Sequence, residues 1–293
     1  MNGVPPARLD TRSVRRGFER AIQTYAGAAA LQTESRQELL ARLDFFALRP
    51  ATVADLGAGL GEGGEALRQR FPDARIVEVD LAHAMLTEHR RSWRFWRRRQ
   101  AVCADVRQLP LPDRCVDLAF SNLMLQWCDE PALAFAEIAR VLKPGGLLLA
   151  STFGPLTLQE LRAAWAGADD RPHVSDFPDL PQLATALGVS GFQEPVLDRD
   201  LRTEHHRELS GIMRELRDLG ARNAARDRRR ALTGTARWRR MAAGYEQVRT
   251  SGGLPVTWEL IYMAAFAGDR SAASLPVGER RIDVGSIGRR HRP

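Results

Sequence analysis

Cysteine is scarce in this sequence: Cys103, Cys115 and Cys128 are the only three, and no two of them form a Cys-x-x-Cys pair. An odd and scattered set of cysteines argues against a disulfide framework, and no cysteine or histidine spacing matches a zinc site. We therefore expect a cytoplasmic protein with reduced thiols and no bound metal.

Long apolar runs are also missing. No stretch reaches the roughly 18–20 residues that a membrane helix needs, and residues 1–12 lack the apolar segment of a signal peptide. Apolar residues still make up 44% of the 293-residue chain, which is enough for a core. The sequence predicts one large domain, or one with a sizeable insertion, that does not bind a membrane.

Lysine is nearly absent, because Lys143 is the only one, and arginine supplies the rest of the positive charge. A GC-rich genome explains the preference for arginine but not the net charge of +7. An excess of positive charge favours an acidic partner, which can be nucleic acid, anionic lipid or an acidic protein. Composition alone does not choose among these three.

Periodic patterns divide the chain. Apolar residues recur at helical spacing from Val14 and again over residues 36–48, which predicts an N-terminal helical cap over residues 1–50. Strand and helix patterns then alternate, and this alternation predicts an α/β fold with a mostly parallel seven-stranded sheet covered on both faces. The expected strands are 52–56, 76–80, 101–104, 116–121, 147–152, 194–203 and 257–266.

The same patterns set the expected limits of the domain. A helix over residues 131–142 begins with a proline and is expected to stop at the Lys-Pro-Gly-Gly of residues 143–146. Further helical patterns predict insertions near residues 155–190 and 206–250 of a domain spanning 51–268. Residues 269–293 are polar and basic, and we expect them to be disordered.

One segment has the composition of a ligand-binding turn. A buried strand ends in Asp55 and turns through Gly57, Gly59 and Gly61 into a helix. Glycines allow a sharp turn and a close approach of a ligand to the main chain. By itself this signal is weak, because a glycine-rich turn without a ligand, or the dinucleotide pattern of residues 59–64, also explains it.

Three strand ends downstream strengthen the interpretation. The second strand ends in Asp80, where an acid can bind both hydroxyls of a ribose, and the third leads to Asp105 and Val106, beside which an adenine can lie. The fourth ends in Ser121 and Asn122. Each acid alone is a common helix cap or surface charge. The carboxyl ends of parallel strands meet in one crevice, so together they predict a nucleoside site.

These segments resemble the class I methyltransferases. DLGAGLG is similar to their first motif, EVDLAHAML to the second, CADVRQLPLPD to the third and FSNLMLQW to the fourth. The resemblance implies a Rossmann-like fold and S-adenosylmethionine as cofactor, with NAD as the competitor for the same crevice. The cofactor-binding residues that we expect are Asp55, Gly57, Gly59, Gly61, Asp80, Leu81, Asp105, Val106, Asn122, Tyr25 and Gln32.

A second resemblance extends over residues 14–266. The segments VRRGFERAIQTY, SNLMLQWC, FGPLTLQEL, MRELRDLGARN and GLPVTWELIY are similar to the malonyl-acyl-carrier-protein O-methyltransferases of biotin synthesis. The sequence departs from that family at Glu19, at Ala26 and in the WRFWRRR block of residues 93–99. The resemblance implies methylation of the free carboxylate of a malonyl thioester.

This reaction asks for positioning more than for proton transfer. A carboxyl group titrates near ~4, so the acceptor is already an anionic nucleophile at neutral pH. We therefore assign no general base and expect an enclosing lid that excludes water. The expected substrate-binding residues are Tyr25, Gln126, Trp127, Phe153, Phe177, Arg214 and Arg217.

For two of these side chains a simpler interpretation is open. Arg214 borders the apolar stripe of its helix and is suited to bind a carboxylate, but a solvated surface arginine fits the pattern equally well, and Arg217 is the weaker candidate. A buried tryptophan at Trp127 is more often part of a core. His173 follows the fifth strand, where a core or loop role is the more common one.

The expected partner is an acidic acyl carrier protein that bears the malonyl group. Residues 90–99 or the arginine-rich residues 226–240 are candidates for its landing surface, although solvated helix faces are the usual role of such runs. Other hypotheses are a different small-molecule methyltransferase and a related non-methylating assembly or hydroxylase-type factor. RNA methylation rests on charge alone, and we expect no nucleic-acid partner.

Overall fold

The computed structural model describes residues 9–92, 100–221, 223–228 and 233–269. The WRFWRRR block and most of the basic tail lie outside the described residues. Within the described part of the chain, no helix is both long enough and apolar enough to cross a bilayer.

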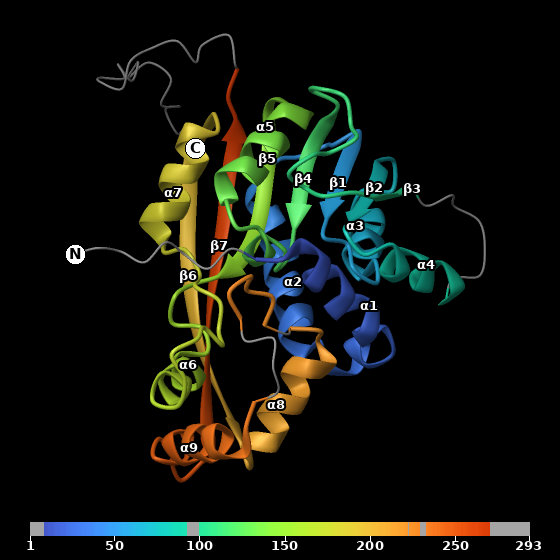
Figure 1. Ribbon diagram of the computed structural model, residues 1–293. Helices are drawn as coiled ribbons and strands as arrows, with labels where there is room; N and C mark the ends of the chain where they lie inside the picture. The colour runs from blue at the N-terminus through green and yellow to red at the C-terminus, as the bar shows by residue number, and fades with distance from the viewer. Residues whose placement is uncertain (1–8, 93–99, 222, 229–232, 270–293) are drawn as a thin grey trace, which may run out of the picture.

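A seven-stranded sheet with the order β3-β2-β1-β4-β5-β7-β6 forms the centre of the molecule (Figure 1). All neighbouring pairs from β3 to β5 are parallel, whereas β7 pairs antiparallel with both β5 and β6. The predicted α/β fold with a mostly parallel sheet is confirmed. The strands are β1 (Thr52–Leu56), β2 (Arg75–Asp80), β3 (Gln100–Cys103), β4 (Val116–Ser121), β5 (Leu142–Phe153), β6 (Phe192–His206) and β7 (Leu254–Ala267).

Helices cover both faces, because each central strand alternates between two apolar clusters. Val53, Leu118 and Leu147 belong to one cluster, and their neighbours Ala54 and Ala119 belong to the other. Helices α2, α3, α6, α8 and α9 contribute to the first cluster, and α5 and α7 to the second. The helices are α1 (Thr11–Ala28), α2 (Ala30–Arg42), α3 (Glu62–Arg70), α4 (His83–Ser92), α5 (Pro131–Val141), α6 (Gln159–Ala166), α7 (Leu180–Val189), α8 (Leu209–Asp218) and α9 (Thr235–Glu246).

The Lys-Pro-Gly-Gly segment corrects one prediction. Helix α5 ends at Val141, one residue before the predicted limit, and residues 143–146 belong to β5 and do not form a separate stop. Val116 pairs with Leu142 and Leu118 with Leu147, so the segment is a bulge in the strand. Pro144 and Gly145 are exposed there, and Gly145 has a φ of +77°, which fits an interrupted ladder.

Two further elements differ from the sequence prediction. The second N-terminal helix, expected over residues 36–48, begins already at Ala30 and ends at Arg42, followed by a short 3-10 turn over Leu43–Phe45. The arginine-rich region contains a helix, α9, whose buried Met241 and Tyr245 hold it to the core.

Four helices gather at the end of the sheet where the parallel strands terminate. Figure 1 shows α1, α6, α8 and α9 near and beyond the arrowheads of β4 and β5. Helix α6 packs on α9, and α1 packs on both α4 and α8. This end of the sheet is where the sequence predicts a ligand site.

Candidate active site

The glycine-rich turn after β1 has the backbone that the sequence predicts. Gly57, Gly59 and Gly61 have φ values of +78°, +54° and +80°, a region that side chains with a Cβ rarely adopt. The Gly57 N–H donates to the Val79 carbonyl at 2.8 Å, so the turn is fixed to the end of β2. No other atom lies within 4 Å of the position that a Cβ of Gly59 would occupy, which leaves room for a ligand.

Asp80, at the end of β2, connects two turns. One of its carboxylate oxygens accepts the Gly59 N–H at 2.8 Å, and the other accepts the Ala82 N–H at 2.7 Å. Burial raises the pKa of the Asp80 carboxyl, although both backbone hydrogen bonds act in the opposite direction. Each carboxylate oxygen can accept a second hydrogen bond, for example from a hydroxyl of a ribose.

Asp55 lies beneath the same turn and is only 3% exposed. Its Oδ2 has no hydrogen-bond partner in the described structure. Burial, together with the charges of Glu78 and Asp80, raises the pKa of the Asp55 carboxyl to about 7. A cationic group bound nearby would favour the charged carboxylate.

Asp105 is held by a neighbouring arginine. The Arg107 guanidinium donates to both carboxylate oxygens of Asp105, at 2.9 and 2.6 Å, and its Nη2 also donates to the Thr11 hydroxyl at 3.0 Å. This arrangement ties the loop after β3 to the start of α1. Sequence reasoning places Asp105 against an adenine but does not anticipate Arg107.

A cavity of about 530 Å³ connects these groups to the far side of the sheet end. One half is bounded by the turns that contain Gly57, Gly59, Asp80 and Asp105. The other half is bounded by the end of β5, by α6 and the loop after it, and by α8, α9 and β7. The residues of this second half include Phe153, Leu161, Trp165, His173, Ser175, Phe177, Met213, Leu216, Arg217, Asn223, Trp238 and Trp258.

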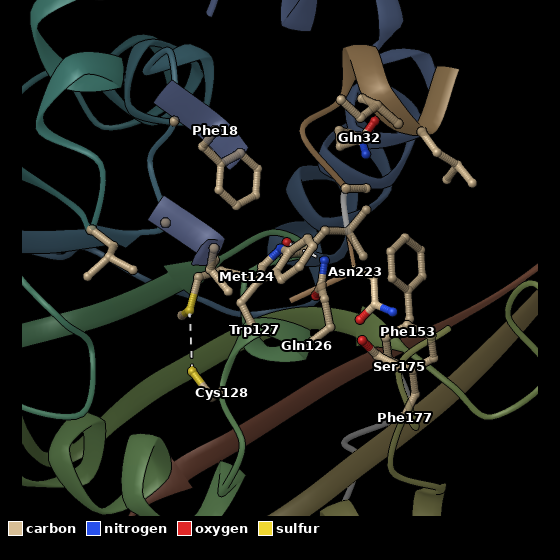
Figure 2. A pocket seen from close by; sticks show the side chains of 18 of the residues that line it. Phe18, Gln32, Met124, Gln126, Trp127, Cys128, Phe153, Ser175, Phe177 and Asn223 are labelled. Atoms are coloured by element: carbon tan, nitrogen blue, oxygen red, sulfur yellow. Dashed lines mark hydrogen bonds between the residues drawn. The ribbon is translucent and has the colours of Figure 1, made fainter. Parts of the chain in front are cut away.

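Aromatic rings dominate the second half. The Phe153 ring stacks on Trp258 at 5.5 Å between centroids and meets Phe177 edge-on at 5.7 Å. Figure 2 shows Phe153, Ser175 and Phe177 together at one side of the cavity, with Phe18 and Met124 across from them. Trp258 is only 4% exposed, and its indole N–H has no hydrogen-bond partner in the described structure. A buried donor of this kind is suited to a ligand oxygen.

Two helices cover the cavity at close distance from each other. A Cβ on Gly17 of α1 would lie 2.7 Å from the Gly220 carbonyl oxygen, which follows α8. The Thr24 hydroxyl also donates to the Asp218 carbonyl at 2.9 Å. The inner faces of the two helices line the cavity with Val14 and Phe18 and with Met213 and Leu216. They are therefore in the position expected of an enclosing lid.

The structure brings together most of the side chains that the sequence predicts. The predicted site residues that line the cavity are Tyr25, Gln32, Gly57, Gly59, Asp80, Leu81, Asp105, Val106, Asn122, Gln126, Trp127, Phe153, Phe177 and Arg217. Their individual roles stay predictions. The side-chain amide of Asn122 donates a hydrogen bond to the Gln32 carbonyl at 2.9 Å, so Asn122 also positions α2.

Three predicted residues lie outside the cavity lining. Asp55 borders a smaller pocket beside it, which Tyr25 and Gln32 share. Gly61 is the N-cap of α3. Arg214 is exposed on α8 and does not line the cavity, because it points away from the buried face formed by Leu209, Ile212 and Leu216. The expectation that Arg214 orients the acceptor therefore finds no support in this geometry.

The sequence does not single out several lining residues. Trp165 and His173 stack in parallel at 3.6 Å, and Nε2 of His173 lies 3.3 Å from the Asp169 carboxylate. The sequence favours a core or loop role for His173 and gives no role to Trp165 or Trp258. These residues are separated along the chain, so no local pattern predicts that they contact one another. Tryptophan is also common in any core, so its presence alone does not indicate a site.

The first half of the cavity is compatible with S-adenosylmethionine. The open space at Gly59 and the remaining acceptor capacity of Asp80 suit the main-chain approach and the ribose of this molecule. In the adjoining smaller pocket, the unpartnered oxygen of Asp55 suits its cationic end. Asp55, Asp80 and the glycine turn are the residues that would hold it.

Comparisons with known proteins agree with this fit. Residues 54–150 match a family described as a methyltransferase domain. The structure of YcgJ from Bacillus subtilis is similar to the chain with a TM-score of 0.57 at 15% identity, covering 81% of this chain and 99% of that one. A phosphoethanolamine N-methyltransferase of Haemonchus contortus, in complex with S-adenosyl-L-methionine, gives a TM-score of 0.50 at 17% identity, covering 86% of this chain and 57% of that one. Fold and site define a Rossmann-like methyltransferase that uses S-adenosylmethionine.

Closer relatives identify the family. Malonyl-[acyl-carrier protein] O-methyltransferase of Xylella fastidiosa (strain M23) is 45% identical over 269 residues, which cover 91% of this chain and 90% of the relative. The protein of the same name from Halorhodospira halophila is 39% identical and is covered, like this chain, over its full length. The chain belongs to the malonyl-[acyl-carrier protein] O-methyltransferase family.

Proposed function

We propose that this protein methylates the free carboxylate of a malonyl group carried as a thioester on an acidic acyl carrier protein. The product, a malonyl methyl ester, would serve biotin synthesis in the cytoplasm. The observation that carries the proposal is the divided cavity: acidic groups and glycines form one half, and aromatic side chains form the other.

The two halves have different tasks. S-adenosylmethionine supplies an electrophilic methyl group when bound. On the protein side, Asp80 and the glycine turn fix the nucleoside, while Phe153, Phe177 and Trp258 form an apolar wall around the acyl group. An in-line contact at roughly 3–3.5 Å between acceptor and donor is worth several kcal/mol of barrier. Positioning is therefore the main contribution of the chain.

Exclusion of water adds to this effect. Attack of an anion on a cation disperses charge, and a site with little water favours such a step. Helices α1 and α8 cover the cavity, and their close glycine contact leaves no space between the two backbones at Gly17 and Gly220. We assign no general base, because the acceptor carboxylate is ionised at neutral pH.

Two groups are suited to orient the acceptor. Arg217 is an arginine that lines the cavity and, among the described residues, has no ion pair, whereas Arg107 is committed to Asp105. Trp258 offers a buried N–H to an oxygen of the acyl group. A guanidinium binds a carboxylate more strongly than a neutral donor does, so Arg217 is assigned to the carboxylate and Trp258 to the thioester oxygen.

Incubation of the purified protein with malonyl-acyl carrier protein and methyl-labelled S-adenosylmethionine tests the proposal. We expect label in a base-labile ester on the carrier protein. Acetyl-acyl carrier protein, which lacks the free carboxylate, is the matched control and should stay unlabelled. Absence of label on the malonyl substrate, with the cofactor bound, would overturn the proposal.

A further inference from the structure

The outer surface of the lid is basic. Arg12, Arg16 and Arg20 are exposed and follow each other at intervals of four residues, so they share one face of α1. That face is opposite the buried Val14 and Ala21. Arg214 is exposed on α8 in the same way, and Arg217 lies between it and the cavity. Arg12, Arg16, Arg20 and Arg214 are called the lid patch below.

These four guanidinium groups are not neutralised within the described structure. No carboxylate of the described residues lies within ion-pair distance of them, whereas Arg15 on the same helix pairs with Glu19 at 3.6 Å. Several described arginines of residues 226–240, a region predicted as a landing surface, differ in that they bind other parts of the chain. Arg226 donates to the Leu9 carbonyl, Arg228 to the Ser13 hydroxyl and Arg240 to the Ala168 carbonyl.

The contacts between α1 and α8 join the patch into one surface. Gly17 contacts Gly220, and Thr24 contacts Asp218. Arg16 and Arg20 therefore lie beside the point where α1 crosses α8, and Arg214 lies one turn before Asp218 on α8. The opposite faces of the same two helices line the cavity. A molecule bound to the lid patch would therefore lie directly outside the acyl half of the site.

We propose that the lid patch is the docking surface for the acidic carrier protein whose acyl group enters the cavity beneath it. This inference rests on the proposed function, and it concerns how the carrier is recognised rather than which group is methylated. Complementary charge mainly accelerates encounter and selects partners. Single-stranded nucleic acid fits less well, because it needs exposed aromatic rings, and the rings of α1, Phe18 and Tyr25, line the cavity instead.

A charge reversal with a matched control tests the docking surface. The double variant Arg16→Glu, Arg214→Glu changes one residue on each helix of the patch. The control, Arg49→Glu with Arg114→Glu, makes the same change in net charge at the opposite end of the sheet, just before β1 and β4. The KM of each protein is measured for malonyl-acyl carrier protein and for malonyl-pantetheine, which has no carrier protein.

The patch variant should raise the KM for malonyl-acyl carrier protein about tenfold and leave that for malonyl-pantetheine unchanged, as expected for lost electrostatic steering. Added salt should raise the wild-type KM for malonyl-acyl carrier protein, and the difference in this KM between the wild type and the patch variant should become smaller. The control should behave as wild type. Equal KM values of the patch variant and the control for malonyl-acyl carrier protein would overturn the inference. A patch variant that no longer binds a single-stranded oligonucleotide, which the wild type binds, but keeps the wild-type KM would assign the patch to nucleic acid and would also overturn it. Failure of the wild type to methylate either substrate would instead contradict the proposed function.

Discussion

Asp80 supports the cofactor half of the site at the scale of a single residue. Replacement by alanine should weaken binding of S-adenosylmethionine by roughly 1.5–3 kcal/mol, because hydrogen bonds to a charged group are lost. Isothermal titration calorimetry measures this change. The chain offers a matched control in Asp117, which also accepts two backbone N–H groups, from Ala51 and Thr52.

Asp117 lies at the opposite end of the sheet, so Asp117→Ala should lower stability without changing cofactor affinity. A similar affinity loss in both variants would mean that Asp80 acts only through the fold. Unchanged affinity in Asp80→Ala would show that the ribose assignment is wrong.

Asp55 makes stability depend on pH. Its pKa is about 7 in the folded chain and ~3.9 when unfolded, so the folded chain retains a proton that the unfolded chain releases between these values. Stability should therefore fall as pH rises from about 4 to 7. In Asp55→Asn this contribution is absent, and its stability relative to wild type should increase over that range by up to about 4 kcal/mol.

Urea unfolding of both cofactor-free proteins at several pH values measures the difference. Titrating groups that do not interact with Asp55 are common to the two chains and cancel, which leaves Asp55 and its coupling to Glu78 and Asp80. A difference that does not change with pH would place the Asp55 carboxyl at its ordinary pKa.

Trp258 combines packing with an unused donor. Trp258→Phe keeps an aromatic ring beside Phe153 but removes the indole N–H. If that group binds the acyl oxygen, the KM for the malonyl substrate should rise roughly three- to tenfold, while the cofactor affinity stays the same. Tyr262→Phe is the control, because it also removes a polar group from a buried ring of β7 but lies outside the cavity lining. Equal kinetics for Trp258→Phe and wild type would remove this donor from the substrate site.

At the scale of elements, the contact between α1 and α8 depends on one glycine. Gly17→Ala would place a methyl group 2.7 Å from the Gly220 carbonyl oxygen, and the helices would have to separate. We expect a loss of about 1–3 kcal/mol in the free energy of unfolding, with a higher KM for the acyl substrate.

Gly27 is the control on the same helix. A Cβ there meets no atom within 4 Å, so Gly27→Ala should stabilise the protein by up to about 1 kcal/mol through helix propensity. Chemical unfolding of the two variants decides the point. Equal effects of the two substitutions would contradict a tight contact at Gly17.

Element boundaries were predictable where burial is uniform. The strands Thr52–Leu56 and Val116–Ser121 have the predicted limits, because short apolar runs between polar turns leave little choice. The bulge at Pro144 and Gly145 was not predictable, since proline and glycine usually end elements. Helix α9 lies within the predicted helical insertion over residues 206–250 but was not predicted individually, because arginines interrupt the apolar pattern that includes its anchors Met241 and Tyr245.

At the scale of the whole molecule, cofactor binding should be visible in thermal unfolding. S-adenosylhomocysteine at a concentration 100 times its Kd stabilises a protein that binds it only when folded by about 2.7 kcal/mol. This corresponds to a rise in Tm of a few degrees. NAD at the same concentration should give no shift, and a shift with NAD alone would favour the competing cofactor.

The two halves of the cavity differ in how far the sequence predicts them. Asp80, Asp105 and the glycine turn each follow a strand, and parallel strands bring such ends together by necessity. The acyl half is assembled from α6, α8, α9 and β7, whose packing no local pattern fixes. The sequence therefore indicated Phe153 through family likeness and Phe177 through its place after the fifth strand, left a substrate-binding and a surface role open for Arg214, and gave no role to Trp258.

The position of β7 has a consequence for synthesis on the ribosome. This strand is the last to be made, yet it lies between β5 and β6 and is buried along most of its length. Until residue 267 has emerged, the backbone edge of β5 and the whole of β6 have no partner in the sheet. A nascent chain therefore exposes an unpaired strand edge from the synthesis of β5 until that of β7, and an arrested chain that ends before Leu254 should aggregate rather than fold.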